Sequence, residues 1–255
     1  MSDNTQSKIL NIAAKAAEIL LENGSEIYRV EQSVCKIINF FGFKPQCFAT
    51  LTCIIITIED NEEEIVSLVR RVNSRTTHLD KVYKVSFLIK NIKKYNMDSL
   101  NEELDNIRKD APYSFKGNLL ASCSGAAFFS ILFSGNLHEF SSAFIAGCVV
   151  GIFSKISNIL KLGTFFHNLM CGFALTSTVC FLYHINFITQ ISIPIISTLM
   201  LLVPGVAFIN SMRDIFEGDL VTGVSRLLEV LMVGTSIAIG SGIALNLFYN
   251  IGGKI

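Results

Sequence analysis

Residues 162–212 read LGTFFHNLMCGFALTSTVCFLYHINFITQISIPIISTLMLLVPGVAFINSM, and these 51 residues contain no Lys, Arg, Asp or Glu. A transmembrane helix needs about 20 predominantly apolar residues to cross a hydrocarbon core about 30 Å thick. The run is therefore too long for one membrane helix and has the length of two. The polar sequence Tyr183-His184-Ile185-Asn186 near its middle predicts the turn between them.

Three further stretches have a similar composition. Residues 117–137 contain no charged side chain, and residues 140–160 contain only Lys155, close to one end. The last stretch begins near Leu220 and carries Arg226 and Glu229 before a long uncharged run. The sequence thus predicts five transmembrane helices, over residues 117–137, 140–160, 163–184, 188–210 and 221–249.

Charge is distributed very unevenly along the chain. Residues 1–116 hold 16 basic and 16 acidic side chains, whereas the following 139 residues hold five of each. Such a step in composition separates a water-facing part from a lipid-facing part. We therefore expect a membrane protein, with a small α+β domain over residues 1–112 and a bundle of five transmembrane helices over residues 113–255.

Hydrophobic periodicity gives the expected elements of the N-terminal domain. Apolar residues at helical spacing predict helices over residues 9–22, 25–41, 79–94 and 99–109, with Ser25 as the N-cap of the second. Residues 65–72 are expected to form a strand. The β-branched residues of 46–58 predict either a pair of strands or one long bent strand.

The distribution of Lys and Arg predicts the orientation in the membrane. In the five-span topology Lys155, Lys161 and Arg213 fall on the same side as residues 1–112, whereas Lys254 falls on the other side. Basic residues accumulate in cytoplasmic loops, so the N-terminal domain is expected in the cytoplasm. Residues 1–6 are polar, so a signal peptide is not expected.

Composition also excludes several classes of protein. Only 16% of the residues are charged, against about 25% in soluble domains, and the 21 basic residues are balanced by 21 acidic ones. This balance argues against a nucleic-acid partner, which would select a basic surface. The seven Cys residues form no CxxC pair, so a metal or disulfide framework is not expected. Without a GxSxG, HExxH or P-loop motif, we predict no catalytic residues, no cofactor and no enzymatic activity.

Polar residues near the end of the predicted fourth span are the first candidate site. Asn210 and Asp214 are four residues apart, so they share one helix face. Pro204 and Gly205 precede them and can break the helix, and broken helices form substrate sites in transporters. The alternative is a kinked helix whose polar end meets water.

Two charges in the last predicted span are the second candidate site. Arg226 and Glu229 are three residues apart, and a charge within the membrane costs about 2.5–3.5 kcal/mol on insertion scales. Arg226 could hold a substrate carboxylate, and Glu229 could carry a coupling proton or receive an ammonium group. The alternatives are a mutual structural pair and a salt bridge to a partner chain. The predicted substrate-binding residues are therefore Pro204, Gly205, Asn210, Asp214, Arg226 and Glu229.

Three stretches together resemble the threonine/serine exporter family. They are residues 20–31 (LLENGSEIYRVE), residues 48–50 (FAT) with 69–80 (VRRVNSRTTHLD), and residues 202–205 (LVPG) followed by Asn210, Asp214 and Gly218. Their order and spacing agree along about residues 8–250. The chain is similar to the larger, N-terminal-type subunit of a split exporter, because full-length members carry a second membrane domain of about four spans.

The resemblance implies a function and a partner. It implies export of threonine- and serine-type amino acids or of dicarboxylates such as succinate across the bilayer of a bacterial inner membrane. It also implies a separately encoded small membrane subunit of about four spans, in a hetero- or homo-oligomer. Because no Walker motif is present, the proton-motive force is the expected energy source. The alternative function is a membrane-anchored sensor or hydrolase acting through the N-terminal domain.

Overall fold

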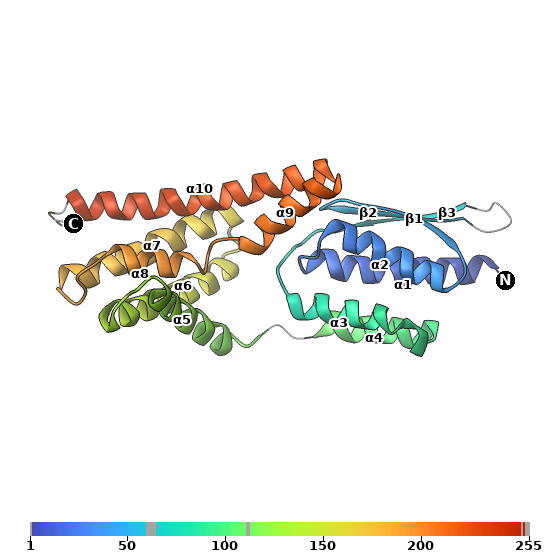
Figure 1. Ribbon diagram of the computed structural model, residues 1–255, viewed down its shortest axis with the longest axis horizontal. Helices are drawn as coiled ribbons and strands as arrows, with labels where there is room; N and C mark the ends of the chain where they lie inside the picture. Colours follow the sequence, from blue (N-terminus) through green and yellow to red (C-terminus); the bar gives the residue numbers. More distant parts are fainter. Residues whose placement is uncertain (1, 60–64, 111–112, 251, 253–255) are drawn as a thin grey trace. The chain divides into compact units, whose positions relative to one another are not determined.

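The computed structural model describes residues 2–59, 65–110, 113–250 and 252. It consists of two compact units, which are coloured along the sequence in Figure 1. The first unit is Met1–Ala111 with Val206–Leu227, and the second is Pro112–Gly205 with Leu228–Ile255. The predicted boundary at residue 112 lies outside the described residues. The assignment of one part to water and of the other to lipid stays a prediction.

The first unit is a small α+β arrangement, and most of its elements follow the predicted periodicity. The 46–58 region forms two strands, so the strand-pair alternative is the correct one. The elements are α1 (Ser2–Glu22), α2 (Ile27–Phe40), β1 (Lys44–Ala49), β2 (Cys53–Glu59), β3 (Ile65–Arg71), α3 (Leu79–Lys90), the 3₁₀ turn η1 (Ile92–Lys94), α4 (Met97–Lys109), most of α9 (Gly205–Glu217) and the first residues of α10 (Leu220–Asn250).

The three strands form an antiparallel sheet in the order β1-β2-β3. Ile54, Ile56 and Ile58 alternate along the central strand and are fully buried on one face, as the two-residue period of a strand requires. That face packs against α1 and α2, and α3 and α4 cover the other side of α1 (Figure 1). The first unit therefore has three layers, with α1 in the middle one.

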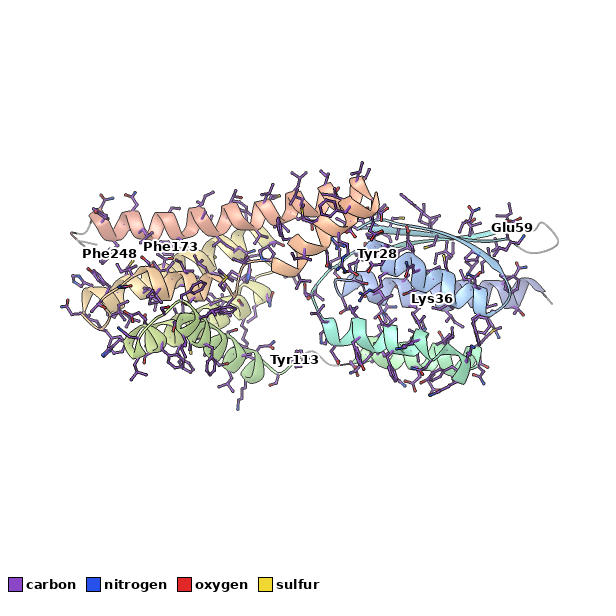
Figure 2. All side chains as sticks on the ribbon, in the orientation of Figure 1. Tyr28, Lys36, Glu59, Tyr113, Phe173 and Phe248 are labelled. Carbon is purple, nitrogen blue, oxygen red and sulfur yellow. The ribbon has the colours of Figure 1, made fainter. Side chains whose placement is uncertain are left out.

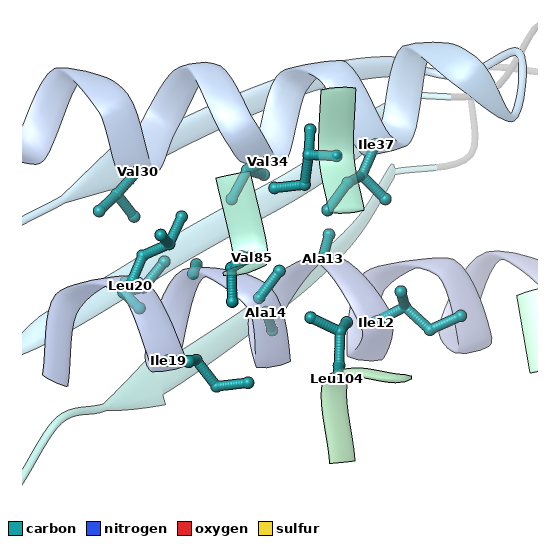
Figure 3. Close-up of a cluster of buried hydrophobic side chains, with 14 of the residues drawn as sticks. Ile12, Ala13, Ala14, Ile19, Leu20, Val30, Val34, Ile37, Val85 and Leu104 are labelled. Atoms are coloured by element: carbon teal, nitrogen blue, oxygen red, sulfur yellow. The ribbon is translucent and has the colours of Figure 1, made fainter. Parts of the chain in front are cut away.

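Helix α1 is enclosed because its apolar residues are distributed around much of its circumference. Ile9, Ala13, Ala16 and Leu20 are inaccessible to solvent. Figure 3 shows Leu20 facing Val30 and Val34 of α2, with Val85 and Leu104 closing the cluster from α3 and α4. Burying one large aliphatic side chain contributes about 1.5–3 kcal/mol, so this cluster supplies most of the hydrophobic stabilisation of the unit.

A tight turn joins α1 to α2, and it positions the candidate site. Gly24 has φ of +90°, a left-handed conformation that favours glycine, and α1 ends just before this turn, at Glu22, where the first predicted helix also ends. The amide of Thr76 donates to the carbonyl of Glu22 over 2.7 Å, and the amide of His78 donates to the carbonyl of Asn23 over 3.1 Å. The loop before α3 therefore holds this turn from one side.

The second unit is a helical bundle packed through small residues. It contains α5 (Phe115–Leu132), α6 (Leu137–Ile159), α7 (Thr164–His184), α8 (Ser192–Leu199) and the remainder of α10. A Cβ atom at Gly147 of α6 would lie 2.7 Å from the Ser122 carbonyl oxygen of α5, closer than side chains tolerate. Glycine at this position therefore lets the backbones of α5 and α6 touch.

The predicted fourth span, residues 188–210, is not one helix. Helix α8 ends at Leu199 and α9 begins at Gly205, and residues 200–204 between them are not helical. Pro204 explains the interruption, since proline lacks an amide donor and disfavours helix in the residue before it. Within the described part of the chain, four helices are long and apolar enough to cross a membrane, namely α5, α6, α7 and α10. The structure supports a multi-pass membrane protein, but the fifth span is not confirmed.

Candidate functional site

The α1–α2 turn contacts α9 and the start of α10 within the first unit. We call the turn residues 24–27 together with Asn210, Arg213, Asp214 and Arg226 the polar cluster. The Asn210 side-chain amide donates to the Gly24 carbonyl oxygen over 3.0 Å. The Arg226 guanidinium donates to the Ser25 carbonyl oxygen over 3.3 Å. Side chains from two helices late in the sequence thus satisfy main-chain carbonyls near its beginning.

Asp214 caps helix α2 from outside. Its Oδ1 accepts a hydrogen bond from the Ile27 amide over 3.3 Å, and Ile27 is the first residue of α2. The first amides of a helix lack intrahelical acceptors and carry partial positive charge, so a carboxylate there is stabilising. The prediction that Ser25 is the N-cap is wrong, because Glu26 occupies that position and makes no side-chain capping bond.

Asp214 and Arg226 form a buried ion pair. Arg226 Nη1 lies 3.3 Å from Asp214 Oδ2, and the two residues are 7% and 0% exposed, in the order Arg226 and Asp214. Burial raises the pKa of Asp214, while Arg226 and the Ile27 amide oppose that rise by stabilising the carboxylate. Removing one member of such a pair leaves an uncompensated charge in a poorly solvated place. The pair therefore depends on both side chains being present.

Glu26 joins two partly exposed arginines at the rim of the polar cluster. It forms ion pairs with Arg213 of α9 and with Arg29, whose Nε lies 3.2 Å from Glu26 Oε2. Tyr28, labelled in Figure 2, occupies the same first turn of α2. Glu26 was missed as a site residue in the sequence. The signal was its place directly after the Gly24 turn, inside a stretch that resembles the exporter family.

The structure brings together three of the six predicted substrate-binding residues. Asn210, Asp214 and Arg226 meet in the polar cluster, and the shared helix face predicted for Asn210 and Asp214 packs on the α1–α2 turn. The other three, Pro204, Gly205 and Glu229, belong to the second unit. The hydrogen bonds of the polar cluster attach the α1–α2 turn to α9 and to the start of α10. Arg226 could also bind a carboxylate that displaces Asp214.

Glu139 of α6 is a buried carboxylate that sequence analysis did not select. It is 1% exposed. Its Oε2 accepts from the Asn136 amide over 2.8 Å, and its Oε1 accepts from the Thr189 hydroxyl over 3.2 Å. The Asn136 side chain in turn accepts from the Glu139 amide, which completes a capping box. The three-residue spacing of Asn and Glu was the available signal, and it indicates a structural role.

Each unit contains a cavity among its described residues. The cavity of the first unit, about 230 Å³, lies between the end of α1, α3 and α4. The cavity of the second unit, about 310 Å³, lies between α7 and α10 and is lined mainly by apolar groups, including Phe181 and Phe248. No group of three or more His, Cys, Asp or Glu side chains suited to a metal ion occurs in the part of the chain that the structure describes.

Comparison with known proteins gives a consistent result. The model of the threonine/serine exporter family matches residues 11–248. A threonine/serine exporter of Corynebacterium glutamicum is 24% identical over 261 residues, which cover 97% of this chain and 53% of that protein. A "probable threonine/serine exporter" of Mycobacterium tuberculosis is 21% identical over 258 residues, covering 97% and 48%. The chain thus spans about half the length of these curated relatives. No solved structure matches it.

Proposed function

The chain belongs to the threonine/serine exporter family, and from that premise we propose that it is a transmembrane exporter subunit for small carboxylate-bearing metabolites. The substrates are threonine- and serine-type amino acids, or dicarboxylates such as succinate. The names of the two relatives support the amino acids. The polar cluster supports a carboxylate in general, because a planar guanidinium binds carboxylates with two parallel hydrogen bonds.

The observation that carries the proposal is the buried Asp214–Arg226 pair. Arg226 lies on α10, which is long and apolar enough to cross a membrane. Asp214 lies on α9 and caps α2. The pair therefore connects a helix of the first unit to a helix that continues into the second. In the proposed mechanism, a substrate carboxylate competes with Asp214 for Arg226 and releases the α1–α2 turn.

Protonation of Asp214 gives a route for coupling export to the proton-motive force. A buried carboxylate that loses its cationic partner to substrate becomes more basic, because burial then acts without compensation. Asp214 would take up a proton when substrate occupies Arg226 and release it when the ion pair re-forms. The charged groups around it are Arg226, Glu26 and Asp219, and the two carboxylates favour protonation as well.

The remaining predicted site residues have roles in the same proposal. Pro204 and Gly205 stand at the interruption between α8 and α9, where main-chain groups freed from helical bonding can bind substrate. Glu229 follows Arg226 by three residues on α10, so the two share a helix face. Glu229 would receive the substrate ammonium group or carry a second proton.

We place the subunit in a bacterial inner membrane with its N-terminus in the cytoplasm, following the Lys and Arg bias. The family resemblance, in which full-length members carry a second membrane domain, supports a separate subunit of about four spans as the partner. The working form is then a hetero-oligomer, or a homo-oligomer if the chain acts without that subunit. Counterflow in liposomes with and without the candidate partner distinguishes the two.

The test is counterflow of labelled threonine, serine and succinate in proteoliposomes. Asp214→Asn and Arg226→Gln should each abolish counterflow, and the double variant should remain inactive although it inserts and folds. The exposed Glu217, one turn further along α9, provides the matched control. Glu217→Gln should export at the unmodified rate. A double variant that regains most of the activity would show that the pair is structural and would contradict the proposed role.

A further inference from the structure

The cavity in the first unit is polar and small. Its volume is about 230 Å³, below the roughly 300–1,000 Å³ typical of drug-sized ligands. Four separate segments line it: the end of α1, the loop before α3, the first turn of α3 and the end of α4. The charged and polar residues that these segments contribute are Glu22, Asn23, Ser74, Arg75, Thr76, Lys81 and Arg108.

Basic side chains outnumber acidic ones in the lining of this cavity. Arg75, Lys81 and Arg108 are cations, and Glu22 is a carboxylate. Arg108 forms an ion pair with Glu18 over 3.2 Å, and Lys81 donates to the Arg108 carbonyl oxygen over 3.0 Å. These two cationic groups are thus held in place by neighbours while still lining the cavity. Burial raises the pKa of Glu22, and the nearby Arg108 and Lys81 lower it.

This combination selects a class of ligand. Arginine and lysine bind a carboxylate, and hydroxyl and amide groups add hydrogen bonds. The Glu22 carboxylate opposes a ligand that carries only negative charge, and it accepts hydrogen bonds from an ammonium group. A ligand with one carboxylate and one ammonium satisfies both ends.

The cavity and the polar cluster share the same piece of main chain. Thr76 and His78 bind the carbonyls of Glu22 and Asn23, whereas Asn210 binds the next carbonyl, that of Gly24. A Cβ atom at Gly24 would lie 3.3 Å from the Thr76 carbonyl oxygen, so the loop lies close against the turn. A ligand that binds Thr76 and Glu22 therefore contacts main chain next to Gly24, whose carbonyl is bound by Asn210 of α9.

We propose that this cavity is a binding site for a free α-amino acid, separate from the transport residues and placed to report the amino-acid concentration to the α1–α2 turn. The identification of the ligand rests on the proposed function, since the exported amino acid is the molecule to be sensed. The site itself rests on the four segments and the charges that line the cavity.

The chain contains no tryptophan, which allows a local optical test. Leu79, the first residue of α3, lies between Thr76 and Lys81 in sequence and is 55% exposed. Phe87 is 54% exposed, two turns further along α3. Leu79→Trp is the reporter variant and Phe87→Trp is the matched control variant. Each full-length variant is titrated in detergent, without any gradient, using threonine, serine, succinate and inorganic phosphate.

Threonine or serine should change the emission of the reporter variant saturably, at least tenfold more tightly than succinate or phosphate, and should leave the control variant unchanged. Adding Arg75→Gln to the reporter should weaken binding at least tenfold, with Arg75→Lys intermediate. Adding Glu22→Gln should reverse the preference in favour of succinate. Lys109→Gln alters an exposed neighbour of Arg108 that does not line the cavity, and it should have no effect.

Four results would overturn the proposal: no saturable change in the reporter variant, an equal change in the control variant, tighter binding of succinate or phosphate, or full binding after Arg75→Gln. Failure here is distinguishable from failure of the proposed function. Export without a fluorescence response of the reporter variant removes only the sensing site. A fluorescence response in a chain that does not export, with its partner present, removes only the transport role.

Discussion

The two units differ in the side chains that they bury. Among the described residues, most of the large apolar side chains that are fully buried belong to the first unit, for example Ile19, Leu20 and Ile56, whereas Leu175 is one in the second unit. In the second unit the fully buried residues include small ones such as Ala126, Ala146 and Ser142, whereas large residues such as Phe128 and Phe181 are exposed. One chain therefore contains a conventional core and a bundle with many of its large apolar groups outside.

The difference is the one expected if the first unit faces water and the second faces lipid, as the charge distribution predicts. In water, burial of large apolar groups drives folding because it removes apolar surface from the solvent. In lipid that force is absent, since the tails are as apolar as leucine, and close contact of backbones through small residues takes its place. The second unit follows the second rule, and the family match agrees with a membrane protein.

The largest expected effect tests backbone contact in the second unit. A Cβ atom at Gly240 of α10 would lie 2.1 Å from the Leu169 carbonyl oxygen of α7, whereas at Gly234 no atom lies within 4 Å. Gly240→Leu should separate α7 from α10 and abolish monodisperse protein in size-exclusion chromatography. Gly234→Leu, on the same helix, should behave as the unmodified chain. Similar behaviour of the two variants would mean that α7–α10 contact does not hold the bundle together.

The next effect compares the two cores directly. Ile56→Ala leaves a cavity in the first unit and should lower its free energy of unfolding by about 2–5 kcal/mol. Leu231→Ala truncates an exposed residue of the second unit and should cost less than about 1 kcal/mol in lipid nanodiscs, because an exposed side chain makes few contacts with protein. Hydrogen exchange of β2 and α10 peptides reports each change locally. A larger loss from Leu231→Ala would indicate that this face of α10 packs on protein.

A smaller, pH-dependent effect is expected from the charged group inside the first unit. Because burial raises the pKa of Asp214, the folded state binds its proton more tightly than the unfolded state, whose pKa is about 3.9. The contribution of Asp214 to the free energy of unfolding is therefore fully present below a pH of about 3.9. It is lost as the pH rises through the pKa of Asp214 in the folded state. Asp214→Asn should flatten this part of the stability–pH curve, measured by thermal unfolding. An unchanged slope would mean that another group is responsible.

The smallest effect concerns a helix cap in contact with water. Asn96 caps α4, and its side chain accepts from the Ser99 amide over 2.8 Å. Asn96→Ala should destabilise the first unit by about 0.5–2 kcal/mol, because water replaces much of the lost bond. Asn91→Ala provides a control, since the Asn91 side chain bonds to the carbonyl of Phe87 in the preceding turn rather than to a helix N-terminus. Equal losses of unfolding free energy in urea from both variants would remove the special role of the cap.

Local features of the chain were predictable because their causes are local. The Gly24 turn, the close packing at Gly147 and the break at Pro204 each follow from one residue type. The composition of residues 46–58 indicated strand without deciding between a pair and one long bent strand. The span over residues 188–210 was nevertheless drawn through Pro204, because hydropathy counts apolar residues without regard to where a helix ends. The length of an apolar run therefore gives the composition of a segment but does not show whether its helix is continuous.

For the polar cluster, the sequence predicted which residues share a helix face but not which groups they bind. The spacing of Asn210 and Asp214 correctly placed both on one helix face. Their partners, the Gly24 carbonyl and the Ile27 amide, are 186 and 187 residues away in sequence. Sequence periodicity carries no information on such pairings. The cap of α2 was assigned to the nearby Ser25 for the same reason, since local capping rules consider only neighbouring side chains.

Helix α10 has a consequence for biogenesis. Its 31 residues extend about 46 Å, well beyond a hydrocarbon core of about 30 Å. The segment from Leu228 to Asn250 belongs to the second unit and by itself measures about 34 Å, so it can span without the first turns of the helix. During insertion, the translocon then meets an apolar segment in which Glu229 is the single charge. Insertion scales give a cost of about 2.5–3.5 kcal/mol for a charge at the centre of a membrane helix. Arg226 need not add this cost, because it lies before the spanning segment and donates to a main-chain carbonyl of the first unit.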